Sequence, residues 1–164
     1  MAIHERLARA LDGARVRYNV VPHAEAFTAQ DAAHAAHVSG RRFAKVLVLR
    51  EGLRNYFLAV VPAHEHVDFG AIRRHTGRQA IGLADELEIQ RLFPDCEAGA
   101  MPPFGELYHL PMYVDPCLAS PGEIWFEAGT HHEALRMNWE DFRAAAGPFT
   151  GMFCMHSPKE VLVP

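Results

Sequence analysis

Three short segments of the chain hold residue types that could bind a small anionic ligand and position a water molecule. One lysine, Lys45, interrupts an otherwise apolar run at 43–49. A loop at 92–105 is rich in glycine and proline, and two imidazoles, His131 and His132, follow a Gly-Thr pair. A cation in an apolar setting, rigid backbone amides and an imidazole can together stabilise negative charge and move a proton. The three segments therefore predict one small-molecule pocket.

The loop at 92–105 is the strongest candidate for the centre of this pocket. Its prolines and small residues suit neither a helix nor a strand, and they restrict the backbone path. Gly99, Ala100 and Met101 have amide N–H groups, whereas Pro102 and Pro103 have none. Amide donors that are fixed before a reaction can form an oxyanion hole without reorganising. We expect the three amides to fulfil this role.

Three polar candidates each have two interpretations. Lys45 could hold a phosphate, a carbonyl or a water, or its amine could reach solvent along its apolar stem. His131 could position a water or contact the ammonium of a substrate, or it could be a surface residue, as a histidine in such a turn commonly is. Spacing does not separate it from His132. Asp115 could orient Lys45, or it could form a turn before a proline.

Composition argues against several classes of function. The net charge of −4 argues against a protein that coats DNA. No apolar run approaches the ~20 residues needed to span a bilayer. The N-terminus lacks the apolar core of a signal peptide, so a cytoplasmic location is expected. The three cysteines (Cys96, Cys117 and Cys154) form no CxxC pair, which argues against a disulfide framework and a zinc knuckle.

The elements that must position these residues follow from periodicity and turn signals. The runs at 43–49 and 55–61 predict an antiparallel hairpin, because a short polar turn separates them. Strands and helices without a regular βαβ rhythm predict an α+β domain with a mixed or antiparallel sheet. Helices are predicted at 3–11, 31–38, 67–75, 85–93 and 139–146, and the other strands at 15–21, 79–83, 110–114, 123–127 and 133–137.

Five segments carry a resemblance to a known family. They lie at 43–47, 57–62, 99–105, 113–115 and 127–131. In order and spacing they resemble the YbaK family, the freestanding relatives of the editing domain inserted in bacterial prolyl-tRNA synthetases. The resemblance covers about 15–146 of a single expected domain at 1–164, and 147–164 form a C-terminal tail.

The resemblance implies a curved sheet flanked by helices and hydrolysis of the ester that joins a wrong amino acid to tRNA. It implies the tRNA acceptor end as partner, with a synthetase as a further candidate, and no cofactor, metal, membrane or DNA. Lys45 stands at the family's lysine, and 99–103 match its GxxxP loop. The implied catalytic residues are Lys45, Gly99, Ala100, Met101 and His131, and the implied substrate-binding residues are Phe43, Pro103, Phe104, Gly105, Asp115, Gly129, Thr130, Arg41 and Arg42.

The expected reaction is direct attack by water on a small amino acid carried by tRNA, with tRNA-Pro among the candidates. No GxSxG motif is present to supply a nucleophilic serine. The family suggests a contribution from the ribose hydroxyl of the tRNA. Val46 stands where alanine-specific members often have Asn, and Ala98 and Pro102 replace a glycine and a serine of the loop. The sequence therefore does not assign the amino acid.

Two other functions stay open at this point. The eleven histidines raise the question of a metal hydrolase, since His34 and His37 lie three apart and His64 and His66 alternate. However, no HExxH motif is present, and such pairs usually lie on a polar helix face. A non-catalytic module that binds an aminoacyl or nucleotide group is the main alternative to hydrolysis.

Overall fold

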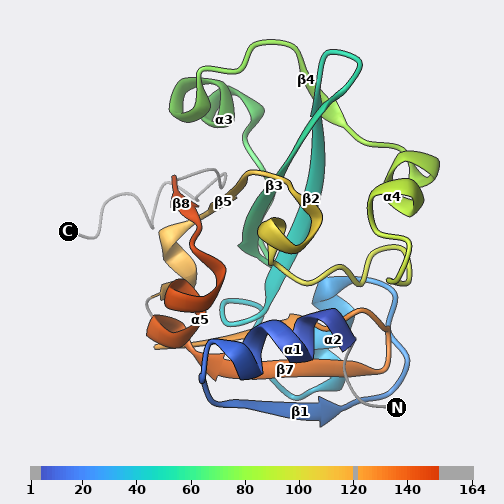
Figure 1. Ribbon diagram of the computed structural model, residues 1–164, viewed down its shortest axis with the longest axis vertical. Coiled ribbons are helices and arrows are strands. Elements are labelled where there is room, and N and C mark those ends of the chain that lie inside the picture. The colour runs from blue at the N-terminus through green and yellow to red at the C-terminus, as the bar shows by residue number, and fades with distance from the viewer. Residues whose placement is uncertain (1–4, 120–121, 152–164) are drawn as a thin grey trace.

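The computed structural model describes residues 5–119 and 122–151, which form two sheets with helices around them (Figure 1). The helices are α1 (Glu5–Gly13), α2 (Ala29–Ala35), α3 (Phe69–Thr76), α4 (Glu86–Leu92) and α5 (Trp139–Ala146), with 3-10 turns η1 (Gly105–Tyr108) and η2 (Pro116–Ala119). This arrangement confirms the predicted α+β class. None of these helices is long and apolar enough to cross a membrane.

The two sheets differ in topology. The three-stranded sheet has the order β1 (Tyr18–Pro22), β7 (Glu133–Asn138) and β6 (Glu123–Glu127), and both of its pairs are antiparallel. The five-stranded sheet has the order β4 (Ile81–Leu83), β2 (Ala44–Glu51), β3 (Asn55–Pro62), β5 (Met112–Val114) and β8 (Phe149–Thr150). Its β2–β3 hairpin is antiparallel as predicted, whereas β3–β5 and β5–β8 are parallel, so this sheet is mixed.

Most element ends follow the signals in the sequence. Strand β6 and helix α5 have the predicted bounds, and α3 ends at Gly77, which is left-handed with φ of 75°. Strand β1 begins later than predicted, because Arg15 at φ of 57° still belongs to the turn that ends α1. Helix α2 begins and ends earlier than predicted. Thr28 caps its start by accepting from Asp31 N at 3.0 Å, and His37 has φ of 58° just after its end.

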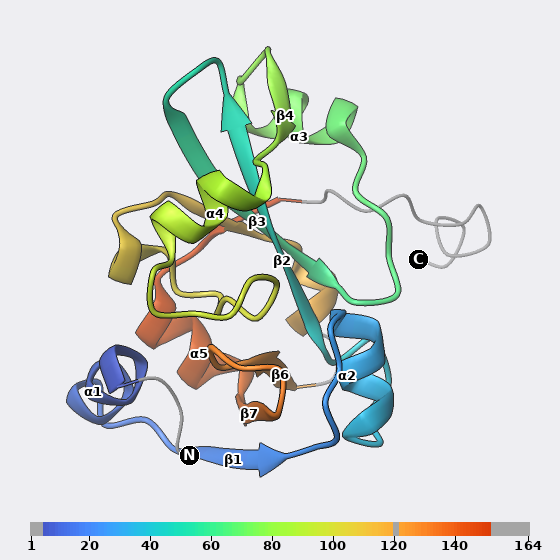
Figure 2. The same ribbon diagram turned by 90° about the vertical axis from the view of Figure 1, so that its right-hand side faces the viewer.

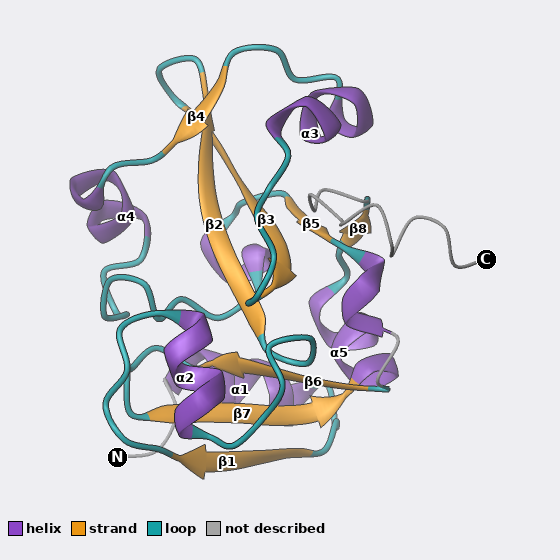
Figure 3. Ribbon diagram, turned by 180° about the vertical axis from the view of Figure 1, so that it is seen from behind, coloured by secondary structure: helices purple, strands orange, loops and turns teal. Residues whose placement is uncertain are grey.

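The beginning of β2 joins the two sheets. Phe43 forms an isolated bridge with Trp125, and Trp125 N donates to Arg42 O at 2.8 Å. Figure 3 shows β2 running down to β6 at this point. The loop after α4 lies between α4 and the three-stranded sheet (Figure 2). The lysine strand, the glycine loop and the β6–β7 turn are therefore all anchored around one sheet junction.

Gly105 lies where this loop enters η1, and it has no room for a side chain. A Cβ there would lie 2.4 Å from Leu110 O and 3.0 Å from Met112 Cβ, so backbone would have to move. We expect Gly105→Ala to lower the free energy of unfolding by about 2–3 kcal/mol, measured by urea denaturation. The control is Gly82→Ala in β4, where a Cβ would meet nothing within 4 Å. An equal loss in both variants would contradict this explanation.

Candidate active site

The glycine loop is fixed by the turn between β6 and β7. Glu97 N donates to Gly129 O at 2.8 Å, and Gly129 N donates to Ala100 O at 2.9 Å. Gly99, between these two anchors, has φ of 89°, a conformation that side chains rarely adopt. The structure thus brings the predicted residues Gly99, Ala100 and Gly129 together, although about thirty positions separate them in sequence.

The three amides predicted as oxyanion donors are not equivalent. Ala100 N already donates to Glu97 O at 3.0 Å inside the turn. Gly99 N donates to the thioether of Met101 at 3.2 Å, and sulfur is a weak acceptor that an oxyanion would displace. Met101 N has no acceptor within the described part of the chain. The amides that an oxyanion could use are therefore those of Gly99 and Met101.

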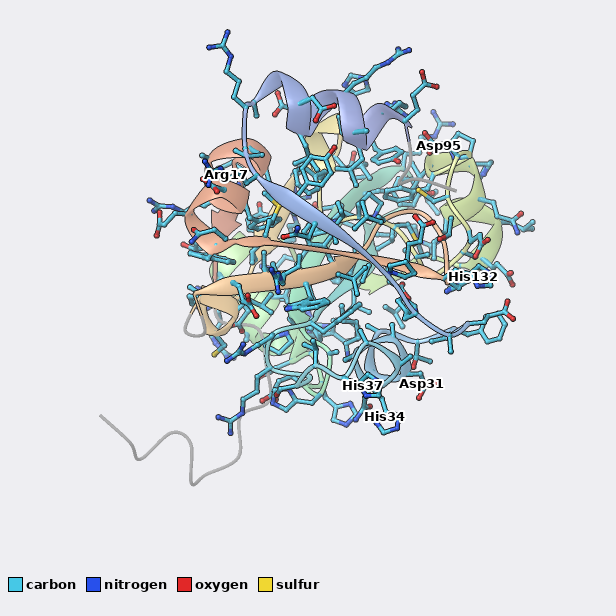
Figure 4. The ribbon with its side chains drawn as sticks, turned by 90° about the horizontal axis from the view of Figure 1, so that it is seen from below. Arg17, Asp31, His34, His37, Asp95 and His132 are labelled. Atoms are coloured by element: carbon cyan, nitrogen blue, oxygen red, sulfur yellow. The ribbon has the colours of Figure 1, made fainter. Side chains whose placement is uncertain are left out.

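Of the two neighbouring histidines, His131 is the buried one. It is 5% exposed, and its Nε2 lies 2.8 Å from Ala98 O. Because a carbonyl oxygen only accepts, Nε2 must carry the proton. His131 N donates to Glu97 Oε2 at 2.8 Å. His132 lies at the periphery of the molecule (Figure 4), with its ring 3.8 Å from the Glu25 carboxylate.

Glu127 was missed by the sequence reasoning and lies behind His131. Its carboxyl Oε1 is 3.8 Å from His131 Nδ1, and neither atom has a hydrogen-bond partner among the described residues. Burial, and secondarily the charge of Glu97, raises the pKa of Glu127 to about 8. A signal was available in the sequence: Glu127 directly follows the apolar run at 124–126 and precedes the histidine by four positions.

A cavity of about 710 Å³ opens beside the loop and His131. Its lining includes the carboxylates of Glu25 and Glu97 but no lysine or arginine, so it favours a cationic group. Phe27 is 67% exposed at this cavity, with its ring centroid 5.1 Å from that of His131. The complete lining is Glu25, Phe27, Gln90, Phe93, Pro94, Cys96, Glu97, Ala98 and His131.

Lys45 is not among the residues that line this cavity. Its Nζ donates to the Glu65 carbonyl at 2.5 Å, on the strand face opposite that of Ala44 and Val46. Neighbouring side chains of a strand point to opposite faces, so the core contacts of Ala44 and Val46 turn the lysine away from the main core. The bond to Glu65 fixes the direction of its stem.

Several predicted substrate-binding residues are part of the core instead. Phe104 is 3% exposed and packs against Phe126 and Phe142. Phe43 is fully buried in the cluster around Trp125. These two residues were predicted to bind substrate, but in this structure their side chains support the elements around the site. Pro103 and Gly105, also predicted to bind substrate, are buried as well, and so is the side chain of Met101, which was predicted to act through its amide.

The remaining predicted residues lie at the edges of the site. Asp115 is fully buried and accepts from Cys117 N at 2.9 Å, which fits the interpretation as a turn former after β5. Thr130 accepts from His132 N at 3.4 Å within the β6–β7 turn. Arg41 and Arg42 are exposed before β2, and Arg42 pairs with Glu123 at 2.9 Å.

Neither a cysteine nucleophile nor a metal site is supported by the geometry. Burial raises the pKa of Cys96 to about 11, so its thiol stays protonated at neutral pH. Cys154 lies outside the described residues. His34 on α2 and His37 just after it are exposed, as is Asp31, and all three lie at the edge of the molecule (Figure 4). Within 5–119 and 122–151, no group of three or more potential metal ligands occurs.

Comparisons with known proteins agree with this architecture. The chain is 27% identical over 149 residues to the multifunctional Ser/Thr-tRNA deacylase ProXp-y of Escherichia coli (strain K12). This matched region covers 88% of this chain and 89% of that protein. The crystal structure of a candidate trans-editing enzyme for prolyl tRNA synthetase superposes with a TM-score of 0.79 at 24% identity, over 93% of this chain and 97% of that chain. The hypothetical protein APE2540 superposes with a TM-score of 0.81 at 17% identity, over 91% and 99%.

The comparison with protein families settles the class. The model of the aminoacyl-tRNA editing domain family matches residues 23–145, a span that contains the glycine loop, the lysine strand and the β6–β7 turn. The predicted resemblance and the predicted aminoacyl-tRNA deacylase activity are confirmed by this match. The chain therefore belongs to the aminoacyl-tRNA editing domain family.

Proposed function

We propose that the chain hydrolyses, in trans, the ester between tRNA and a mismatched small amino acid, with tRNA-Pro among its candidate carriers. The observation that carries this proposal is the fixed loop beside the cavity. In this loop Gly99 directly follows Ala98, whose carbonyl is 2.8 Å from His131 Nε2. The name of the Escherichia coli relative, a Ser/Thr-tRNA deacylase, supports a small side chain on the substrate.

The proposed reaction is direct attack by water on the ester carbonyl. The water oxygen bonds to the carbonyl carbon, and the resulting oxyanion accepts from the Gly99 and Met101 amides. The carbon–oxygen bond to the ribose then breaks, and the ribose oxygen takes up the proton that the attacking water has released. Cys96 is not the nucleophile, because burial raises the pKa of its thiol to about 11. The carboxylates of Glu25 and Glu97 suit the α-ammonium of the amino acid.

The basic residues before and within β2 are proposed to hold the acceptor end of the tRNA. Arg41 and Arg42 are exposed, and Lys45 follows on the same strand end. Guanidinium and ammonium groups bind phosphate without reading sequence. In this arrangement Lys45 contacts the terminal nucleotide, while the ester enters the cavity next to the loop. The acidic lining of the cavity keeps the phosphates outside it.

The test is a deacylation assay on tRNAs charged with Ala, Ser, Cys, Thr or Pro. Turnover of one or more of these substrates would support the proposal and identify the amino acid. No turnover by a folded protein, together with thermal stabilisation by an adenosine analogue, would favour the binding module.

Gly99→Ala is expected to lower kcat by about 10²-fold, because φ of 89° strains any side chain and would turn the amides away from the oxyanion. A Cβ itself would meet His131 Cε1 and Phe27 O only at 3.5 Å, an ordinary contact. The matched control is Gly77→Ala, which has φ of 75° and open space and lies at the end of α3. It should lose stability but keep its activity per folded molecule. Equal kcat in wild type and Gly99→Ala would contradict the role of the loop.

A further inference from the structure

The structure contains a buried acid behind the imidazole that the proposed reaction does not use. We propose that Glu127 is a positioning residue that acts through His131 to hold the Ala98–Gly99 peptide, and with it the oxyanion amides, in place. This inference rests on the proposed function for its kinetic consequences. Its geometric part concerns only the ligand-free protein and can be tested separately.

The first step is the orientation of the imidazole. His131 Nε2 lies 2.8 Å from Ala98 O, and this contact is a hydrogen bond only if Nε2 carries the proton. In the neutral ring, Nδ1 then has the lone pair. Nδ1 is buried and lies 3.8 Å from Glu127 Oε1. The atom of His131 that needs a donor therefore faces Glu127.

The second step is the state of the carboxyl group. Glu127 is 4% exposed, and its Oε1, like His131 Nδ1, has no hydrogen-bond partner among the described residues. A protonated carboxyl satisfies both atoms at once by donating to Nδ1. The distance of 3.8 Å is longer than a hydrogen bond, as such contacts often are in ligand-free sites. One proton then joins the two side chains.

The third step connects this pair to the reaction. A trans peptide unit is planar, so its carbonyl and the following N–H point in opposite directions. A bond from His131 to Ala98 O therefore also sets the direction of Gly99 N–H. Glu127 holds His131, His131 holds Ala98 O, and the peptide aims Gly99 at the oxyanion. A misplacement of about 1 Å in such a group can cost 10²-fold in rate.

Other ionisable groups face the same imidazole. Glu97 Oε2 accepts from His131 N at 2.8 Å and lies 4.0 Å from Nε2, while Glu25 lies across the cavity. Both are carboxylates on the cavity side, whereas Glu127 lies on the buried side. Loss of the Glu127 proton would leave a carboxylate facing the Nδ1 lone pair. The loop would then lose its support as the pH rises.

The kinetic test compares glutamine and leucine at position 127. Glu127→Gln keeps a donor for Nδ1 and cannot ionise, so kcat should stay within about 3-fold of wild type at pH 7, and the fall in kcat at alkaline pH should disappear. Glu127→Leu keeps the volume but has no donor, so kcat should fall by about 10–100-fold with KM unchanged. If Glu127 served only to fill space in the core, Glu127→Leu would keep full activity, and that result would overturn the proposal.

The structural test requires no substrate. Nitrogen-15 NMR of the His131 ring should report the Nε2–H tautomer in wild type and in Glu127→Gln, and a mixture of tautomers in Glu127→Leu. The same His131 tautomer in all three proteins would overturn the positioning role of Glu127, even if the enzyme is active. Conversely, the expected spectra in a protein that deacylates no tRNA would defeat the proposed function and leave the Glu127–His131 pair intact. If Glu127→Leu does not fold, Glu127→Gln tests the proposal alone: a fall in its kcat at alkaline pH equal to that of wild type would overturn it.

Discussion

Replacing Lys45 with methionine is expected to lower kcat/KM for the aminoacyl-tRNA substrate by about 10–100-fold, the usual loss when one hydrogen bond to a charged group is removed. Methionine keeps an unbranched apolar stem of similar length but has no charge. The bond from Nζ to Glu65 O at 2.5 Å holds the stem in one direction, so the ammonium would meet a phosphate without reorganising. Steady-state kinetics on the best substrate of the charged-tRNA panel measure the effect.

The control for this variant must separate the local charge from the overall charge. Arg54→Met, in the exposed β2–β3 turn, removes the same charge from the far end of the hairpin and should leave kcat/KM unchanged. Because a phosphate contact weakens as salt competes for the phosphate, the difference between wild type and Lys45→Met should shrink at high ionic strength. Equal kinetics for wild type and Lys45→Met at low salt would remove the lysine from the proposed site.

The free energy of unfolding is expected to fall by up to about 5 kcal/mol as the pH rises from 4.5 to above 8, because of Glu127 alone. Burial raises the pKa of this carboxyl from 4.5 to about 8 in the folded protein. Between these two values the folded state retains a proton that the unfolded state has released. The stabilisation is complete below pH 4.5 and is lost as the pH passes through about 8.

Urea denaturation at a series of pH values checks this prediction, with Glu127→Gln as the comparison. The glutamine variant cannot ionise, so its stability should vary much less between pH 5 and 9. Glu88 has the opposite sign: its backbone hydrogen bond at Asp85 and its pairing with Arg50 lower its pKa, so its contribution is lost as the pH falls. The fall in the free energy of unfolding at acid pH that Glu88 causes should therefore be the same in wild type and Glu127→Gln. Parallel curves for wild type and variant above pH 5 would contradict the assignment to Glu127.

Local patterns in the sequence predicted most of the elements. The hairpin of β2 and β3, strand β6 and helix α5 depend on apolar periodicity and on turns or caps within a few residues, and the structure has all four. The predicted starts of α2 and β1 differ from the structure because a helix cap or a turn, and not the apolar periodicity, sets where each element begins. Thr28 starts α2 early, and Arg15 at φ of 57° delays β1. The parallel pairings of β3 with β5 and β5 with β8 were not predicted, since distant segments form them.

The sequence by itself determined the family, the glycine loop and the imidazole, because these depend on residue types at fixed spacing. Only the tertiary structure decided which of their atoms remain for chemistry. It engages the Ala100 amide with Glu97, buries Phe104 in the core and selects His131 rather than His132. It also places Glu127 behind that ring. The physical reason is that hydrogen bonds and burial depend on neighbours in space, and Ala98 and His131 become neighbours only when the loop packs on the β6–β7 turn.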